Sequence, residues 1–314
     1  MDAPTLGRPV VSYRQPDPEY RRENFFSQSE AKELLISPAH WLARYGPDAK
    51  PFFPTPAMQL GTALHHRVLE PESFKSNFVS RSNYGGEPTV AELKELLTAQ
   101  GADFKKSAKK SELLTLAYPD GPPEDKRKVL SEDDWEHVHG MHAALRSHDY
   151  TGMWFDPGQT NYRENNEVSV YSKTHQGHMI KGRFDRIQIT GDTLQILDLK
   201  TCDKATPKHF QRKVVDFRYD LQAAWYTRLA AEAFAKLNIE FIFIAIEKKP
   251  PYGICLYRAS ESILDHGNRL MDKALNILGE RRALNDWPAY PPEILDLELP
   301  AWEKMQEDEP CLEF

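Results

Sequence analysis

Hydrophobic and polar residues alternate on both sides of Gly191-Asp192, from Lys181 to Thr201. Alternation is the period of a half-buried strand, and a Gly-Asp pair between two such runs is typical of a two-residue hairpin turn. If these two residues are the whole turn, Thr190 faces Thr193 and the rest of the register follows. This register predicts that Asp185 lies directly opposite Asp198.

Two carboxylates at directly opposed positions are unfavourable, because their Cβ atoms lie roughly 4.5–5.5 Å apart and like charges there destabilise a sheet. A divalent cation would remove the repulsion. Lys200 shares a face with Asp198, whereas Leu197 and Leu199 point to the other face. Oxygen ligands without a nearby thiolate favour Mg²⁺ or Mn²⁺ over zinc. We therefore expect a metal site on this hairpin.

Helix signals precede the hairpin. Ser27 and Glu30 have capping-box spacing, and Pro38 divides the helix that they begin. Thr55-Pro56 predicts the start of another helix, which runs to about Leu69. His65 lies one turn after Gly61 on the same face of that helix.

The remaining pattern mixes strands and helices. The apolar, β-branched run 239–247 is typical of a central buried strand. We expect further strands at 165–171 and 252–258 and helices at 131–147, 220–237 and 260–284. This order predicts an α/β fold in which helices flank a central mixed sheet.

Asp185 followed by Asp198-Leu199-Lys200 resembles the P-D…(D/E)-x-K nuclease superfamily, which has a restriction-endonuclease-like core. Gly61 to His65 is similar to the G-x-x-x-H motif of its RecB-type members, and Gln222 to Tyr226 is similar to their Q-x-x-x-Y helix. The run from Gly61 to Pro71 resembles RecE-type phage exonucleases most closely. The resemblance covers about residues 25–290.

The resemblance implies a role for each motif residue. It implies that His65, Asp185, Asp198 and the backbone carbonyl of Leu199 hold one or two Mg²⁺ or Mn²⁺ ions. Glu167 is either a further ligand or a solvated strand residue. Lys200 would position or activate the attacking water. The implied catalytic residues are Asp185, Asp198, Lys200, Gln222 and Tyr226.

The resemblance also implies an activity. RecE-type enzymes are Mg²⁺-dependent 5′→3′ exonucleases on linear double-stranded DNA, need no ATP, and leave a 3′ single strand for a RecT-like annealing protein. They form homo-oligomeric rings, and a tetramer is favoured here over a trimer. Two alternatives stay open: a structure-specific or single-strand endonuclease of the same superfamily, and a non-catalytic protein that binds DNA ends.

The net charge of −7 is unusual for a nucleic-acid binder, but the charge is unevenly placed. The segment 181–218 has nine basic and five acidic residues, so it is locally positive. Local potential steers a polyanion more than net charge does. We expect DNA contacts in this segment from Arg183, Arg186, Lys204 and Lys208.

Residues 1–24 are expected to form a flexible or surface-draped arm, and residues 25–290 the nuclease domain. Residues 88–118 resemble a helix-extension-helix module of the SAP or LEM type, inserted in that domain. It would contact phosphates through Lys105, Lys106, Lys109 and Lys110, or else be an amphipathic helical pair with a solvated lysine turn. The acidic tail 291–314 either docks an annealing partner or is solvated.

Three well-separated cysteines fit a reducing compartment and argue against a four-cysteine iron–sulfur cluster. No apolar run approaches the roughly 20 residues of a membrane span, and the first residues lack a signal-peptide pattern. We therefore expect a soluble, cytoplasmic protein with no membrane partner.

Overall fold

The computed structural model describes residues 8–84, 88–105, 107–119 and 125–298. Lys106 and residues 299–314, which include most of the acidic tail, lie outside the described part of the chain. Their predicted roles therefore stay predictions.

The hairpin around Gly191-Asp192 is present as predicted. Strand β6 (Met179–Thr190) pairs antiparallel with β7 (Thr193–Cys202), and Gly191 occupies the turn with φ +61°. Thr190 faces Thr193, which confirms the expected register. The ladder ends at the pair Arg186–Leu197, one position before Asp185.

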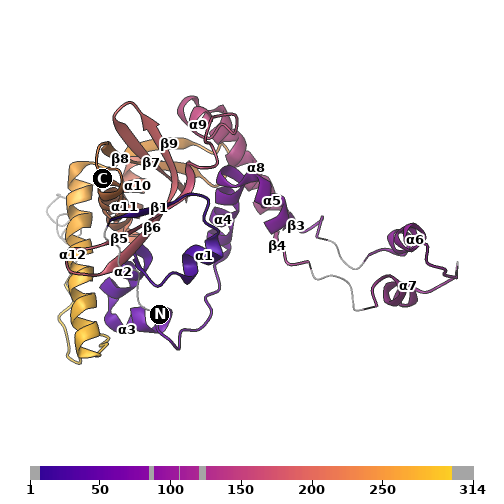
Figure 1. Ribbon diagram of the computed structural model, residues 1–314, viewed down its shortest axis with the longest axis horizontal. Coiled ribbons are helices and arrows are strands. Elements are labelled where there is room, and N and C mark those ends of the chain that lie inside the picture. The colour runs from indigo at the N-terminus through magenta and orange to yellow at the C-terminus, as the bar shows by residue number, and fades with distance from the viewer. Residues whose placement is uncertain (1–7, 85–87, 106, 120–124, 299–314) are drawn as a thin grey trace, which may run out of the picture.

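A mixed sheet forms the centre of the molecule (Figure 1). In spatial order it contains β1 (Val10–Ser12), β5 (Asn166–Lys173), β6, β7, β8 (Asn238–Glu247) and β9 (Ile254–Arg258). The short β2 (Phe26–Ser27) also pairs with β6. The β7–β8 and β2–β6 pairs are parallel and the others are antiparallel. The predicted central mixed sheet is confirmed, with β8 as its buried interior strand.

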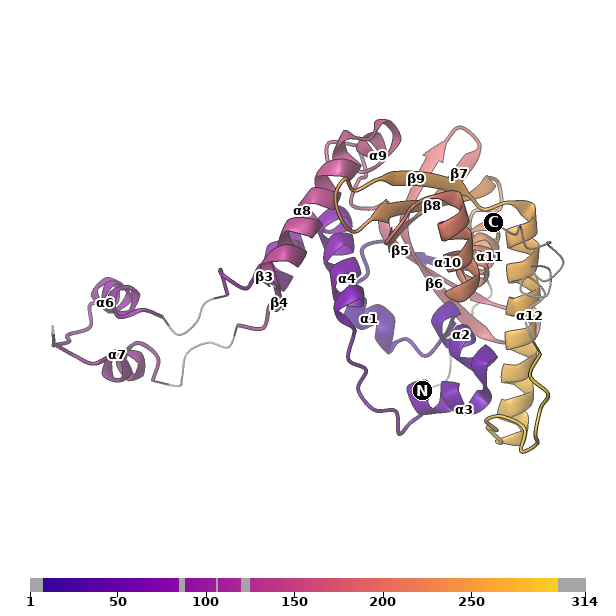
Figure 2. The same cartoon turned by 180° about the vertical axis from the view of Figure 1, so that it is seen from behind.

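Helices cover both faces of the sheet, as Figures 1 and 2 show. One core lies under α2 (Gln28–Ile36), α10 (Pro207–Asp216), α11 (Tyr219–Ala233) and α12 (Glu261–Leu284). The other lies under α4 (Pro56–Leu69), α5 (Pro71–Asn77), α8 (Glu132–Ser147) and the segment after α9 (Asp149–Trp154). Alternation of β7 feeds both cores, because Ile196 packs in the first and Leu197 in the second.

The predicted helix starts agree with the structure. Ser27 and Glu30 form the capping box of α2, and Ser37 caps the following α3 (Pro38–Tyr45). The Thr55 side chain caps α4, and Ser260 caps α12. In the part of the chain that the structure describes, no helix has the length and apolar character needed to cross a bilayer.

The N-terminal segment is not a detached arm. Strand β1 extends the sheet by pairing with β5, and α1 (Asp17–Arg22) follows it. The buried Lys181 ammonium donates to the backbone carbonyls of Tyr20 and Glu23 at 2.9 and 2.7 Å. From residue 10 onward the prediction of a flexible arm is therefore wrong, and the surface-draped alternative fits.

The segment 88–118 forms a helical pair that stands away from the sheet in both views (Figures 1 and 2). Helix α6 (Val90–Ala99) and α7 (Lys110–Ala117) share a small core of their own, which includes Leu93 and Leu113. A parallel pair of short strands, β3 (Phe78–Ser80) and β4 (Lys128–Leu130), lies where this pair leaves the body.

Substitution of Gly267 by Ala should destabilise the fold. A Cβ atom there would lie 2.1 Å from the backbone oxygen of Asp220 and 2.7 Å from the Cβ of Ala224, so α11 and α12 would have to separate. Overpacking of this kind costs about 1–3 kcal/mol, more than the gain in helix propensity. Urea denaturation measures the loss.

Gly61→Ala is the matched control, since its added Cβ would meet only the Thr201 hydroxyl at 3.5 Å, an ordinary contact. This variant should be as stable as the wild type or gain about 0.5–1 kcal/mol. Equal stability of Gly267→Ala and wild type would contradict the packing argument.

Candidate metal centre

The strand backbone is irregular where the site forms. Phe184 and Ile187 are three residues apart, yet both pack in the same core, so the alternation of β6 shifts by one residue between them. On the neighbouring strand, Glu167 has φ +52°, in the left-handed region. A residue other than glycine seldom adopts this conformation, and such strain clusters at functional sites.

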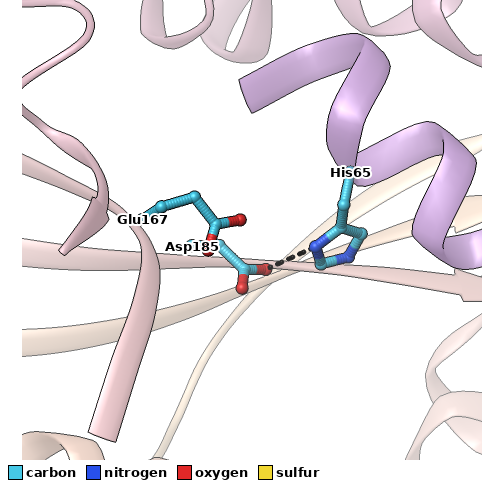
Figure 3. Close-up of side chains that lie close together, drawn as sticks. All are labelled: His65, Glu167 and Asp185. Atoms are coloured by element: carbon cyan, nitrogen blue, oxygen red, sulfur yellow. Dashed lines mark ion pairs between the residues drawn. The ribbon is translucent and has the colours of Figure 1, made fainter. Parts of the chain in front are cut away.

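Three groups from different elements meet at this irregularity: His65 from α4, Glu167 from β5 and Asp185 from β6 (Figure 3). One ligand atom of each lies within 4.8 Å of the other two. The His65 Nδ1 is 3.6 Å from Asp185 Oδ2. The structure thus brings together two of the predicted ligands and the carboxylate of Glu167.

The histidine is oriented by the chain. Its Nε2 lies 2.9 Å from the backbone oxygen of Leu199, and a carbonyl only accepts hydrogen bonds. Nε2 therefore carries the proton, and in the neutral ring Nδ1 presents its lone pair toward the carboxylates. A ligating histidine is commonly oriented in this way by a carbonyl partner. Here Leu199 accepts a hydrogen bond from His65, and its predicted role as a metal ligand stays a prediction.

Asp185 does not pair directly across from Asp198, so that prediction is wrong. Its Oδ2 accepts a hydrogen bond from the backbone N–H of Leu199 at 2.8 Å. The carboxylate thus bonds to the neighbouring strand beyond the last ladder pair, where β6 and β7 part.

Burial disfavours the ionised form of Glu167 and raises its pKa to about 8. The Arg183 guanidinium opposes this shift, and the Asp185 carboxylate adds to it. The Arg183 Nε lies 2.5 Å from the Glu167 carboxylate. Two carboxylates and an imidazole in such a setting are the donor set of a divalent cation, which would favour their ionised forms. The residues present therefore fit Mg²⁺ or Mn²⁺.

Asp198 is fully buried beside this group and is held by two other partners. Its Oδ2 lies 2.5 Å from the Lys200 ammonium, and its Oδ1 accepts a hydrogen bond from the Gln222 amide at 2.8 Å. Burial raises the pKa of Asp198 to about 6; Lys200 opposes this and Asp185 adds to it. Its role as a metal ligand stays a prediction, because both oxygens are engaged here.

Lys200 is a stable cation. Burial disfavours its charge, but Asp198 and Asp185 outweigh that effect and raise its pKa above the ordinary value. A protonated ammonium donates hydrogen bonds and neutralises negative charge, but it cannot accept a proton.

Tyr226 lies on α11, one turn after Gln222, and its predicted catalytic role stays a prediction. Its ring is buried, 5.0 Å from that of Phe184, and packs closely on Gly182. Among the described residues its hydroxyl makes no hydrogen bond to Lys200 or to the site carboxylates. Gln222 alone of this motif touches the site, through Asp198.

Two of the predicted DNA contacts are arginines of β6, Arg183 and Arg186. The prediction that Arg186 contacts DNA is wrong, because this side chain is fully buried. Its guanidinium donates hydrogen bonds to Tyr162 O, Asn166 Oδ1 and Gln159 Oε1. Its place follows from the shifted alternation of β6. Arg183 is mostly buried and is engaged by Glu167 and by Asp17.

The other predicted contacts are lysines. Lys204 and Lys208 are exposed just after β7. Lys105 and Lys109 are exposed and Lys110 is half-buried, all on the helical pair that stands away from this site. These positions leave the predicted phosphate contacts untested.

Sequence reasoning missed Lys32 and Tyr219. The ring of Tyr219 lies close to two ammonium groups: the Lys200 Nζ is 5.1 Å and the Lys32 Nζ is 5.5 Å from its centroid. The capping box predicted the helix that carries Lys32, but nothing in its spacing shows that this helix faces the site.

A mixed sheet with a histidine and two carboxylates beside an Asp-x-Lys lysine defines a protein of the PD-(D/E)XK class. Residues 27–295 match the family described as "PDDEXK-like domain of unknown function (DUF3799)", and the chain belongs to that family. This confirms the predicted superfamily.

Among solved structures, the fold is similar to the "Putative exonuclease" from Eubacterium rectale, with a TM-score of 0.55 and 11% identity over 93% of this chain and 98% of that one. At this identity the likeness concerns the fold alone. A structure named SSO0001 matches 69% of this chain and 86% of its own at 17% identity, with a TM-score of 0.26, and supports no conclusion. No protein with a curated description matches the sequence.

Removal of one ligand should weaken metal binding. We expect Asp185→Asn and Glu167→Gln each to lower the affinity for Mn²⁺ by at least about tenfold, because each removes a charged oxygen ligand from the group. Isothermal titration calorimetry measures the affinity.

Asp192→Asn is the matched control, as Asp192 is exposed in the turn at the far end of the same hairpin. It should bind Mn²⁺ as the wild type does. Unchanged affinity in both site variants would exclude this group as the metal centre.

Proposed function

We propose that this protein is a metal-dependent nuclease that digests linear double-stranded DNA from its 5′ ends. The observation that carries the proposal is the His65, Glu167 and Asp185 group beside the buried Asp198–Lys200 pair. Nothing in a purely structural role calls for three carboxylates around one break in a sheet.

When bound, a divalent cation at this group polarises the scissile phosphate and lowers the pKa of a water molecule. His65, Glu167 and Asp185 would hold it, with Asp198 alongside. Lys200 keeps its proton and donates to a phosphate oxygen or to the attacking water. Gln222 fixes the Asp198 carboxylate, and through it the lysine, in one position.

Exonuclease action and polarity rest on the resemblance to RecE-type enzymes. The run from Gly61 to Pro71 forms most of α4 and delivers His65 to the site. By the same resemblance we propose that the enzyme needs no ATP, forms a tetrameric ring, and hands its 3′ single strand to a RecT-like annealing protein. The exposed Lys204 and Lys208 would contact the DNA backbone.

Neutralising the Asp-x-Lys pair should abolish cleavage. We expect Asp198→Asn and Lys200→Met each to lower the cleavage rate by at least about 100-fold, because each removes charge that stabilises the transition state. Thermal unfolding is measured in parallel, since a buried ion pair is being altered.

Lys236→Met, which changes an exposed lysine, is the control and should cleave normally. Ordinary cleavage by either folded site variant would remove Asp198 or Lys200 from the catalytic set.

End-labelled DNA tests the direction of digestion. With Mg²⁺, a linear duplex should release a 5′ label early and a 3′ label late, while a covalently closed circle stays intact. EDTA should stop the reaction because it removes the cation.

The same assay separates the alternatives. Nicking of the circle would indicate an endonuclease of the same superfamily. Retained end binding without any cleavage would indicate the non-catalytic alternative.

A further inference from the structure

Lys32 lies on the face of α2 that is turned to the site. It and Lys200 each lie about 5 Å from the centre of the Tyr219 ring, so their ammonium groups are at most about 11 Å apart. Two lysines from distant parts of the sequence therefore face one small region.

Lys32 lacks an anionic partner of its own within the part of the chain that the structure describes. Among the described residues, no carboxylate forms an ion pair or hydrogen bond with it. The charged groups that face it are Lys200, Asp198 and Asp220. Asp198 is engaged by Lys200 and Gln222, and Asp220 bonds to the Leu221 N–H and to His266.

The surroundings disfavour the charge on this lysine. Burial, and then Lys200, lower the pKa of Lys32 to about 7, and the two aspartates offset only part of the effect. The ring of Tyr219 attracts both ammonium groups, and a desolvated cation–π contact is worth about 2 kcal/mol. The ring does not cancel the repulsion between the two ammonium groups, whereas an anion placed near both lysines would.

Helix α2 holds Lys32 firmly. The capping box of Ser27 fixes the start of the helix, and Ala31 and Leu34, on either side of the lysine, are buried in the core. The strand just before the helix pairs with β6, which carries Asp185. The position of Lys32 relative to the metal group is thus set by the sheet itself.

We propose that Lys32 binds a phosphate of the substrate strand, next to the phosphate that Lys200 faces. The spacing of the two lysines is compatible with neighbouring phosphates of one strand, which are about 3.4 Å apart along the duplex axis and farther apart through space. This inference rests on the proposed function. The group bound is either the terminal 5′ phosphate or an internal phosphodiester.

Salt-dependent DNA binding in EDTA tests the inference without any cleavage. Lys32→Met should bind a linear duplex about tenfold more weakly, and the slope of log affinity against log salt should fall by about 0.9. Lys32→Arg keeps the charge and should stay within about threefold of the wild type. Lys273→Met, an exposed lysine on α12, is the control and should change neither quantity.

Cleavage of duplexes with 5′-phosphate or 5′-hydroxyl ends identifies the phosphate. If Lys32→Met cleaves more slowly than the wild type only on phosphorylated ends, Lys32 binds the terminal phosphate. If its cleavage rate falls equally on both kinds of end, Lys32 binds an internal phosphate. Affinity and salt slope of Lys32→Met equal to those of the control would overturn the inference. An equal loss of DNA affinity in Lys32→Met and Lys32→Arg would also overturn it, because the lysine would then act through packing and not through its charge.

The two proposals fail separately. If the wild type does not cleave, the nuclease proposal falls, yet the salt slope still decides whether Lys32 contacts a phosphate.

Discussion

The central constraint is the burial of the Asp198 carboxylate beside a second carboxylate, that of Asp185. A buried charge must be paired and hydrogen-bonded, or its pKa shifts until it is neutral. Lys200 and Gln222 meet that demand for Asp198, and the Leu199 N–H meets part of it for Asp185. Because Asp198 is on β7 and Gln222 is on α11, this pairing requires the two elements to pack closely. The geometry of the site therefore depends on the packing of the core.

The break between β6 and β7 explains how groups from both faces of the sheet meet. Asp198 and Lys200 belong to the side of β7 that packs under α11, whereas His65 comes from α4 on the other side. A continuous sheet would keep them apart, because its backbone forms a wall between the layers. Where the ladder ends, Asp185 bonds to the Leu199 N–H, and Leu199 O accepts from His65. One peptide segment thus links the two layers.

Much of this architecture is predictable from the sequence because its signals are local. A two-residue turn fixed the register from Thr190–Thr193 onward, and side-chain caps such as Ser27 fixed the helix starts. The predictions that were wrong concern positions that tertiary contacts decide. The alternation of β6 shifts beside the left-handed backbone of Glu167, and no glycine in the sequence marks this irregularity. Arg186 is buried there, and Asp185 bonds to the Leu199 N–H. Lys32 was missed for the same reason, since tertiary contacts bring its helix to the site: the β2–β6 pair just before the helix, and the contact of Lys32 with the Tyr219 ring of α11.

The balance of local charge resolves the apparent conflict between a net charge of −7 and the proposed DNA substrate. Glu167 and Asp185 suit a cation, whereas Lys200 and Lys32 suit the phosphates of a strand that such a cation would hold. The carboxylates and the lysines lie within one short region and carry opposite charges. Their fields partly cancel at a distance, so the site does not attract DNA from afar as a uniformly basic patch would. Surface charge elsewhere can then be acidic without opposing the reaction, because exposed charges beyond about 10 Å are largely screened at ordinary salt.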